Sequence, residues 1–294
     1  MKHLFIINPV SGSGKHNEVV AIIERHFEDK DDNYEIVLTQ YPGHATELAQ
    51  SAKAPCAIYS IGGDGTGHEI LNGMADDIEL CVVPVGSGND FFRNYNIEFE
   101  LEQYLIDCIE GKIINIDYAT MNDIKFLNCS NIGFDAQVNV EVNKFRLKWM
   151  PRTFIYGLFA LKGLINMAGV KFTLECDGVV SDHDALLASF MNGKYYGGGF
   201  KSAPSASLID GYLNIGIVQQ TQRRKIIPLL PVYYKGEHEG LDIFTSFQSK
   251  HLTIRTQGPI VVGCDGEILE ASTIEFKVVA QGLKLRVPKD VEFN

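Results

Sequence analysis

The segment Gly62-Gly63-Asp64-Gly65-Thr66 directly follows Ala57–Ile61, a short apolar run that is typical of a buried strand. Two more glycine-rich segments follow apolar runs in the same part of the chain: Asn8–Gly14 and Pro84–Asp90. Glycine permits positive φ angles and lets backbone amides approach a ligand closely, and successive amides at a helix start bind phosphate oxygens. A single such loop would indicate only a turn, whereas three of them favour a phosphate-binding edge.

The first 118 residues alternate short apolar runs with amphipathic segments. The expected strands are Leu4–Ile7, Glu35–Thr39, Ala57–Ile61 and Leu80–Val85, and the expected helices are Asn17–Phe27, Ala45–Ala52 and Gly67–Met74. Strands that alternate with helices at this spacing predict a parallel sheet, in which ligands bind beyond the carboxyl ends of the strands. We therefore expect residues 1–118 to form a nucleotide-binding α/β domain whose glycine-rich loops share one edge.

Residues 119–284 have a different pattern, in which apolar and polar residues alternate between turns. The expected strands are Lys171–Cys176, Ala185–Phe190, Leu213–Val218, His251–Thr256, Ile260–Val262, Thr273–Val279 and Leu283–Val287. This pattern predicts an antiparallel, β-sandwich-like second domain over residues 119–284, with one helix near the junction at Thr153–Met167. Residues 285–294 are expected to pack back on the first domain.

The glycine-rich loops do not match the usual nucleotide-binding motifs. Lys15 would be the lysine of a P-loop, but Pro9 and His16 stand where that motif needs Gly and Ser or Thr. Instead, two of the loops contain an acid, Asp64 and Asp90. A carboxylate repels phosphate unless a divalent cation stands between them, and Mg²⁺ binds one or two carboxylates together with substrate phosphates. The loops therefore predict a Mg-nucleotide site, although a helix-capping role would also explain Asp90.

The order of the motifs resembles the diacylglycerol kinase catalytic-domain family. The GGDGT segment at residues 62–66, followed by Glu69 and Asn72, resembles the signature of that family, which sphingosine and ceramide kinases share. The first and third glycine-rich loops match its other two loops. Further similarities lie at Asn131–Asp135, Tyr196–Phe200, Asp210-Gly211 and Asp265-Gly266-Glu267. The resemblance covers nearly the whole chain and is to the soluble bacterial members, although NAD kinases and related sugar kinases also contain GGDGT.

The resemblance implies an ATP- and Mg²⁺-dependent lipid kinase, in which the hydroxyl of a lipid bound by residues 119–284 attacks the γ-phosphate of ATP. The residues that would contact ATP are Asn8, Pro9, Ser11, Gly12, Thr39, Gly62, Gly63, Asp64, Gly65, Thr66, Glu69, Gly86, Ser87 and Asn89. At Ser87 many bacterial members have Thr, so the hydroxyl is kept. Asp64, Asp90 and Asp117 would hold the catalytic Mg²⁺, partly through water. At a second, structural Mg²⁺, Asp210 would supply its side chain, and Ser207 and Tyr212 would supply backbone oxygens.

Two acids near the end of the chain are candidates for proton transfer. Phosphoryl transfer depends mainly on positioning and charge neutralisation, with one group that takes the proton of the nucleophile. Asp265 and Glu267 have the i, i+2 spacing that places both side chains on one face of an extended chain, unless Gly266 turns them apart. The resemblance implies that Glu267 is the general base and that Asp265 is an orienting group or an alternative base. An acidic hairpin tip without a catalytic role is the other interpretation.

Charge and cysteine spacing restrict the class of protein. The 26 Lys and Arg residues against 37 Asp and Glu residues give a net charge of −11, which argues against a general nucleic-acid binder. The six cysteines have no C-x-x-C spacing, and the first residues lack the pattern of a signal peptide. Apolar runs fall well short of the roughly 20 residues of a spanning helix. We therefore expect a cytoplasmic protein with reduced thiols.

Two segments nevertheless have the character of a membrane-docking surface. Val142–Leu174 contains six Lys or Arg residues, no acid and several aromatic residues, and Arg223-Arg224-Lys225 runs into an apolar stretch. These segments predict peripheral docking to an anionic membrane surface that carries the lipid substrate. Packing of the apolar residues in the core is the alternative.

Two alternative functions also remain: a kinase of NAD or another soluble alcohol, and a non-catalytic lipid-binding homologue. The choice of lipid and the formation of a homodimer stay open.

Overall fold

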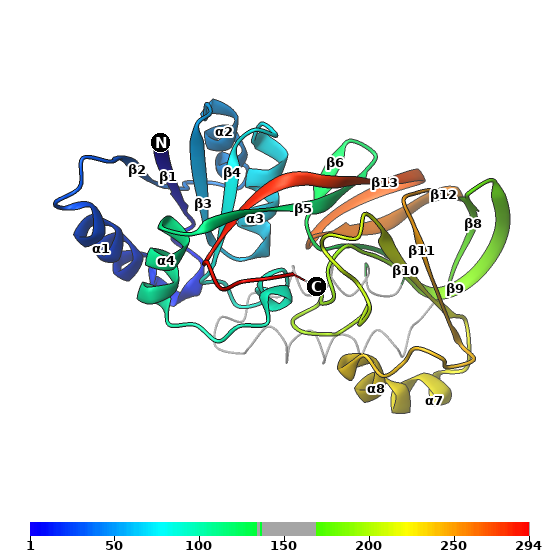
Figure 1. Ribbon diagram of the computed structural model, residues 1–294. Helices are drawn as coiled ribbons and strands as arrows, with labels where there is room; N and C mark the ends of the chain where they lie inside the picture. Colours follow the sequence, from blue (N-terminus) through cyan, green and yellow to red (C-terminus); the bar gives the residue numbers. More distant parts are fainter. Residues whose placement is uncertain (134–135, 137–168, 294) are drawn as a thin grey trace.

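The computed structural model describes residues 1–133, 136 and 169–293 (Figure 1). Four strands of the N-terminal half pair in parallel: β1 (Lys2–Ile7), β2 (Asn33–Leu38), β3 (Cys56–Gly62) and β4 (Glu79–Pro84). Their order is β4-β3-β1-β2, which places the first strand of the chain inside the sheet. Each strand lies within two residues of the range expected from its apolar run.

Helices connect these strands and cover them. Their bounds are α1 (His16–Phe27), α2 (His44–Ser51), α3 (Asp64–Gly73) and α4 (Leu101–Ile109), with short 3-10 turns η1 (Gly12–Gly14) and η2 (Phe92–Tyr95). In α1 the buried side chains are Val19, Ile22, Ile23 and Phe27, the spacing of one helix face. The unexpected helix α4 begins where the Glu100 side chain accepts hydrogen bonds from two backbone amides of the first turn.

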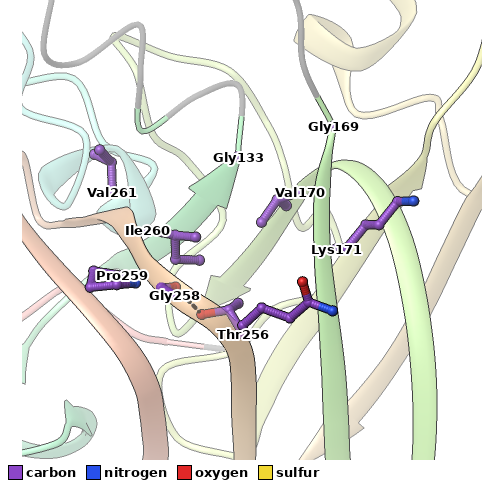
Figure 2. A pocket seen from close by; sticks show the side chains of 10 residues that line it. Gly133, Gly169, Val170, Lys171, Thr256, Gly258, Pro259, Ile260 and Val261 are labelled. Carbon is purple, nitrogen blue, oxygen red and sulfur yellow. Dashed lines mark hydrogen bonds between the residues drawn. The ribbon is translucent and has the colours of Figure 1, made fainter.

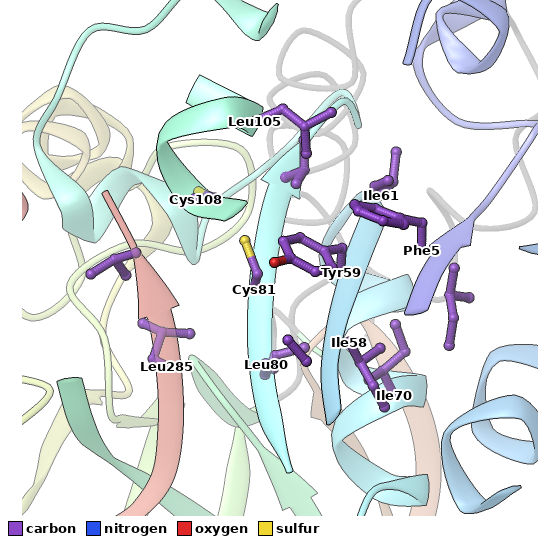
Figure 3. Close-up of a cluster of buried hydrophobic side chains, with 14 of the residues drawn as sticks. Phe5, Ile58, Tyr59, Ile61, Ile70, Leu80, Cys81, Leu105, Cys108 and Leu285 are labelled. Atoms are coloured by element: carbon purple, nitrogen blue, oxygen red, sulfur yellow. The ribbon is translucent and has the colours of Figure 1, made fainter. Parts of the chain in front are cut away.

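The N-terminal core lies between this sheet and its helices (Figure 3). Phe5 and Tyr59 are fully buried there and stack with ring centroids 4.4 Å apart. The Tyr59 hydroxyl remains hydrogen-bonded in the core, 2.9 Å from Nδ1 of His3. Burying each large apolar side chain stabilises the fold by about 1.5–3 kcal/mol. The core therefore gives a rigid base to the loops that follow β1, β3 and β4.

The C-terminal half consists mainly of antiparallel strands. Their bounds are β5 (Lys112–Met121), β6 (Ile124–Phe126), β7 (Cys129–Gly133), β8 (Val170–Cys176), β9 (Val179–Met191), β10 (Leu213–Gln219), β11 (Phe244–Ser249), β12 (His251–Cys264) and β13 (Glu267–Val287). After β10 the chain forms α7 (Arg223–Ile226), the 3-10 turn η3 (Ile227–Leu229) and α8 (Leu230–Lys235). Strand β12 is continuous across the expected strands His251–Thr256 and Ile260–Val262, and β13 is continuous across Thr273–Val279 and Leu283–Val287. Where the sequence predicted a break, each strand instead has a shift in pairing register.

All the described strands belong to one mixed sheet of 13 strands. Strand β13 joins the two halves: its first part pairs antiparallel with β12, and its last part pairs antiparallel with β5 and parallel with β4 (Figure 1). Leu285 of β13 lies opposite Leu80 of β4, and Leu283, Val287 and Val291 are buried in the N-terminal core. Parallel pairing, which the sequence analysis expected for the first domain, therefore joins β1–β4 and the end of β13, and β13 continues the sheet into antiparallel pairing.

Within the described residues, no helix combines the length and the apolar character needed to cross a membrane. The expected helix Thr153–Met167 and most of the basic segment Val142–Leu174 lie outside the described residues. Their predicted roles stay predictions.

Candidate functional site

The three glycine-rich loops meet at the carboxyl ends of β1, β3 and β4. The amides of Val85 and Gly86 donate to the Gly62 carbonyl over 3.1 and 3.0 Å. A Cβ atom on Gly86 would lie 2.4 Å from Cα of Gly63, and one on Gly12 would lie 2.4 Å from the Val85 carbonyl oxygen. Glycine is therefore needed at these positions because the loop backbones pack directly against each other.

Side chains of the first two loops tie them together. Asn8 donates through Nδ2 to Oγ1 of Thr66 at 3.2 Å, while its Oδ1 accepts from the Val10 amide at 3.1 Å. Thr66 lies in the first turn of α3 and is buried. At the end of β2, the Thr39 amide donates to the Ile7 carbonyl at 2.8 Å, so this residue also borders the first loop.

The other residues expected to contact ATP fall into two groups. Pro9, Ser11, Gly65 and Ser87 lie at least partly exposed along the edge that the loops form. Two further side chains bind the protein itself. Asn89 has φ 53° and donates through Nδ2 to the Pro84 and Gly86 carbonyls, and Glu69 accepts from the Ala45 amide at the start of α2. We infer that Asn89 and Glu69 shape the site.

Asp64 and Asp90 lie together at this edge. Asp64 accepts from the amides of Asp90 and Phe91, both at 3.1 Å, through its two carboxylate oxygens. Asp90 is 8% exposed, and its Oδ2 accepts from the Gly198 amide at 2.7 Å. The Arg93 guanidinium Nε lies 3.4 Å from Asp90 Oδ1. The third loop and the Tyr196–Phe200 loop of the C-terminal half therefore meet at Asp90.

The two carboxylates have too little positive charge around them. Burial raises the pKa of Asp64, partly opposed by the amides of Asp90 and Phe91 and increased by the charge of Asp265. Burial and then the Asp64 charge raise the pKa of Asp90 to about 6. Among the described residues, Asp90 Oδ1 is buried and accepts no hydrogen bond, and the Arg93 guanidinium 3.4 Å away opposes the rise in the pKa of Asp90 only in part. A cation beside this oxygen would relieve the repulsion, so the donor set fits Mg²⁺.

A complete metal cage is not formed by these side chains alone. In the part of the chain that the structure describes, no three His, Cys, Asp or Glu side chains are grouped to hold a metal ion. Asp117, the third expected ligand, is fully buried, and its two oxygens accept from the Gly211 and Gln281 amides at 2.6 and 2.7 Å. Asp117 therefore connects β5 to the turn at Gly211 and to the register shift of β13 at Gln281, and its role at a cation stays a prediction.

The expected structural metal site also has its side chains engaged with the protein. The two carboxylate oxygens of Asp210 accept from the Tyr212 amide at 2.9 Å and from the Gln248 side-chain amide at 3.2 Å. Burial raises the pKa of Asp210. Ser207 Oγ accepts from the Ile209 amide at 3.4 Å. These contacts stabilise the turn, and a metal at this turn stays a prediction.

Asp265 and Glu267 lie in the hairpin between β12 and β13. Asp265 and Gly266 have φ angles of 45° and 92°, which matches the two-residue Asp-Gly turn that joins antiparallel strands. The Asp265 carboxylate is buried and accepts from the amides of Leu127, Asn128 and Cys129 at 2.6, 3.1 and 2.9 Å. Glu267 is exposed at the start of β13. The turn at Gly266 thus separates a buried acid, Asp265, which is bound to backbone amides, from an acid exposed to solvent, Glu267.

His68 is a residue of this site that the sequence analysis missed. It lies in α3, one turn after Asp64, and its buried Nδ1 is 3.7 Å from Asp265 Oδ2. Burial alone would lower the pKa of His68, but Asp265, Glu267 and Glu69 outweigh it, so the pKa is raised. The i, i+4 spacing from Asp64 was the available signal, because it places both residues on one helix face.

A separate cavity of about 450 Å³ opens beside β12 (Figure 2). Its described lining is Gly133, Gly169, Val170, Lys171 and residues 256–261. This lining includes none of Asp64, Asp90, Asp265 and Glu267. Strand β12 nevertheless connects the cavity to the acidic turn, because Val261 precedes Asp265 by four residues, about 13 Å of extended strand.

Comparisons with known proteins agree with this arrangement. Residues 2–121 match a family described as diacylglycerol kinase catalytic domain, and residues 129–287 match one described as YegS C-terminal NAD kinase beta sandwich-like domain. The Bacillus subtilis protein named "Putative lipid kinase YtlR" is 33% identical over 98% of this chain and 99% of its own length. A diacylglycerol kinase of Mycobacterium tuberculosis (strain H37Rv) is 30% identical over 97% of this chain and 94% of its own length.

A solved structure shares the fold. "A putative diacylglycerol kinase from Bacillus anthracis str. Sterne" is 23% identical and superimposes with a TM-score of 0.78, covering 97% of both chains. The two domain matches follow one another along the chain, and both relatives align across nearly its whole length. This chain therefore belongs to the diacylglycerol kinase family.

Proposed function

We propose that this protein is an ATP- and Mg²⁺-dependent lipid kinase that phosphorylates the hydroxyl of diacylglycerol or a similar lipid. The product would be a phosphatidic-acid-like lipid. The relatives named above support a lipid kinase. The observation that carries the proposal is the meeting of two acidic groups, Asp64 with Asp90 beside the glycine-rich loops and the Asp265–Glu267 turn beside α3.

The loops and the first acidic pair suit a metal-bound nucleotide. Exposed backbone and hydroxyl groups of the glycine-rich edge, including Ser11 and Ser87, would contact the phosphates. Asp64 and Asp90 would hold Mg²⁺, partly through water. When bound, Mg²⁺ would neutralise phosphate charge during transfer and orient the γ-phosphate. Asp64 is already oriented for this role by the amides of Asp90 and Phe91.

The second acidic group suits proton transfer. Glu267 would accept the proton of the lipid hydroxyl as that oxygen attacks the γ-phosphate, while the bond from the γ-phosphorus to the β–γ bridging oxygen breaks and ADP leaves. Asp265 would act as a positioning residue, because its carboxylate is bound to three backbone amides and faces His68. Its anchoring fixes the start of β13 and therefore the backbone from which Glu267 projects.

The test is an assay of label transfer from radiolabelled ATP to diacylglycerol, a long-chain base, a polyprenol and NAD. NAD belongs in the panel because the C-terminal match is to an NAD kinase-like sandwich. We expect label in a lipid and not in NAD. Label that appears in NAD alone would replace the lipid kinase with a kinase of a soluble alcohol.

The catalytic assignment is tested with matched variants of the same strand. Glu267→Gln is expected to keep the fold and ATP binding and to lower turnover by at least about a hundredfold, the usual contribution of a general base. Glu270→Gln, also exposed on β13, is the control and is expected to retain turnover. Equal turnover in the two variants would show that Glu267 is not the base.

A further inference from the structure

The segment α7–η3–α8 carries two apolar faces, and one of them packs against a core cluster of the described residues. Ile226, Leu230 and Tyr233 belong to a core cluster together with Phe200 and Phe244. Their spacing of four and three residues is that of one face of a helix. This inner face fixes the segment on the C-terminal half, at the lower edge of the view in Figure 1.

The outer face consists of the residues that directly follow those of the inner face: Ile227, Pro231 and Tyr234. Ile227 is 45% exposed and Tyr234 is 48% exposed, and Pro231 between them is also exposed. The inner face is buried by the rest of the molecule, whereas these three residues form an apolar patch on its surface. Contiguous apolar patches on a soluble domain mark interaction sites.

Cations border this outer face. Residues 221–236 contain four Lys or Arg residues and no acid, in a chain with a net charge of −11. Arg224 and Lys225 are exposed at one end and Lys235 at the other. The Lys201 side chain approaches the same end, beside Gly236. The nearest acids in the sequence, Glu237 and Glu239, follow the turn at Gly236, which has φ 77°, and Glu239 accepts from Ser205 Oγ.

We propose that Arg224, Lys225, Ile227, Pro231, Tyr234 and Lys235, here called the α7–α8 surface, dock on an anionic lipid bilayer. Apolar and aromatic side chains framed by cations bind such a surface, since the apolar groups enter the interface while the cations face anionic headgroups. A two-fold dimer through this surface would bring its cations face to face with those of the second copy, because residues 221–236 contain no acid, whereas an anionic bilayer complements them. Binding to the bilayer does not depend on kinase activity. The proposal rests on the proposed function only in taking access to a lipid substrate as the purpose of docking.

The α7–α8 surface is connected directly to the candidate site. The Lys201 amide donates to the Tyr234 carbonyl at 3.1 Å. Three residues earlier in the same loop, the Gly198 amide donates to Asp90 Oδ2. The loop of residues 198–201 therefore links the α7–α8 surface, where a bilayer would bind, to Asp90 of the candidate site.

The test is co-sedimentation with vesicles, without ATP or added substrate. One set contains equal parts phosphatidylglycerol and phosphatidylcholine, and the other contains phosphatidylcholine alone. We expect binding to the anionic vesicles and its loss at high salt. The double variant Arg224→Glu/Lys225→Glu is expected to bind at least about tenfold more weakly, because each cation near an anionic surface contributes severalfold to affinity.

Matched controls separate this surface from general charge and hydrophobicity. Lys53→Glu/Lys289→Glu reverses two exposed cations outside the α7–α8 surface, one between α2 and β3 and one after β13, and is expected to retain binding. Ile227→Asp is expected to weaken binding, whereas Val179→Asp, at a position 67% exposed on β9, is expected to retain it. Circular dichroism of each variant confirms that the fold is intact.

The outcomes distinguish this proposal from the proposed function. We expect the Arg224/Lys225 variant to phosphorylate a dispersed short-chain diacylglycerol at the wild-type rate while losing activity on anionic vesicles. Equal vesicle binding by this variant and by the Lys53/Lys289 control would overturn the docking proposal, even if the protein is a lipid kinase. A dimer in solution that Ile227→Asp dissociates would also overturn it, because the patch would then be an interface between copies.

Discussion

The Gly198 amide donates a 2.7 Å hydrogen bond to Asp90 Oδ2, so a loop of the C-terminal half ends on a carboxylate of the N-terminal half. This contact lies beside Asp64, whose two oxygens accept from the amides of Asp90 and Phe91. The site is thus held by amide donors that compensate only part of its negative charge.

The Asp90 carboxyl group makes stability depend on pH. Its pKa of about 6 in the folded protein exceeds that of an unfolded Asp, so its contribution favours folding at low pH and is lost as the pH rises. We expect the free energy of unfolding of the metal-free protein to fall by up to about 3 kcal/mol between about pH 4 and pH 7. Urea unfolding in a chelator checks this. Asp90→Asn should make the free energy of unfolding less dependent on pH, whereas Asp29→Asn, at an exposed position, should not. If Asp90→Asn keeps the pH dependence of the wild type, the effect does not come from Asp90.

Addition of Mg²⁺ is expected to restore the stability that the carboxylate pair removes. A ligand that binds only the folded state raises its stability, by about 2.7 kcal/mol at a concentration one hundred times its Kd. We therefore expect Mg²⁺ with ATP to raise the Tm near pH 7, and Asp64→Asn or Asp90→Asn to reduce that increase. Asp117→Asn should lower the starting Tm and keep the increase, because the Asp117 oxygens already bind the Gly211 and Gln281 amides. Loss of the increase in Asp117→Asn would place Asp117 at the cation.

Asp265→Asn separates an anchoring role from a catalytic one. The amide NH₂ would face the Leu127 amide donor, and a buried donor without a partner costs about 1–3 kcal/mol. We expect the variant to lose that much stability in urea unfolding, whereas Glu267→Gln should unfold like the wild type. If Asp265→Asn keeps its stability but loses turnover, Asp265 is a proton acceptor and the anchoring interpretation is wrong.

His68 should act through Asp265. Its raised pKa means that their pairing stabilises the folded protein below the ordinary His pKa and that this contribution is lost as the pH rises through the higher folded value. The groups that face His68 are Asp265, Glu267 and, on its own helix, Glu69. In urea unfolding, we expect His68→Gln to lack this decrease in the free energy of unfolding with rising pH. We also expect the variant to have a lower kcat and a nearly unchanged KM for ATP. Unchanged kcat across the pH range would limit His68 to a structural role.

Much of the site could be predicted because it depends on local sequence. The carboxyl ends of parallel strands share one edge, so the loops after β3 and β4 bring Asp64 near Asp90. The Asp-Gly turn at Asp265 likewise depends on two adjacent residues with positive φ. The open choice at this turn, between acids on one face and acids turned apart, needed the structure, because Gly266 is compatible with both.

Other features depend on contacts between distant residues. Asp117 accepts from amides 94 and 164 residues away, and the pairing of His68 with Asp265 also crosses from one half of the chain to the other. Apolar periodicity says nothing about such partners. The same holds for the continuous strand β13, which looked like two strands because the register shift between Val279 and Leu283 interrupts its alternation.

Strand β13 also determines when the first half can finish folding. Leu283, Leu285, Val287 and Val291 fill part of the N-terminal core, and Leu285 lies opposite Leu80 on β4. During synthesis, residues near the N-terminus emerge first and domains tend to fold as they appear. The N-terminal core cannot be completed until residues 283–291 have left the ribosome. Until then, the β4 edge of its sheet and part of its apolar interior remain uncovered.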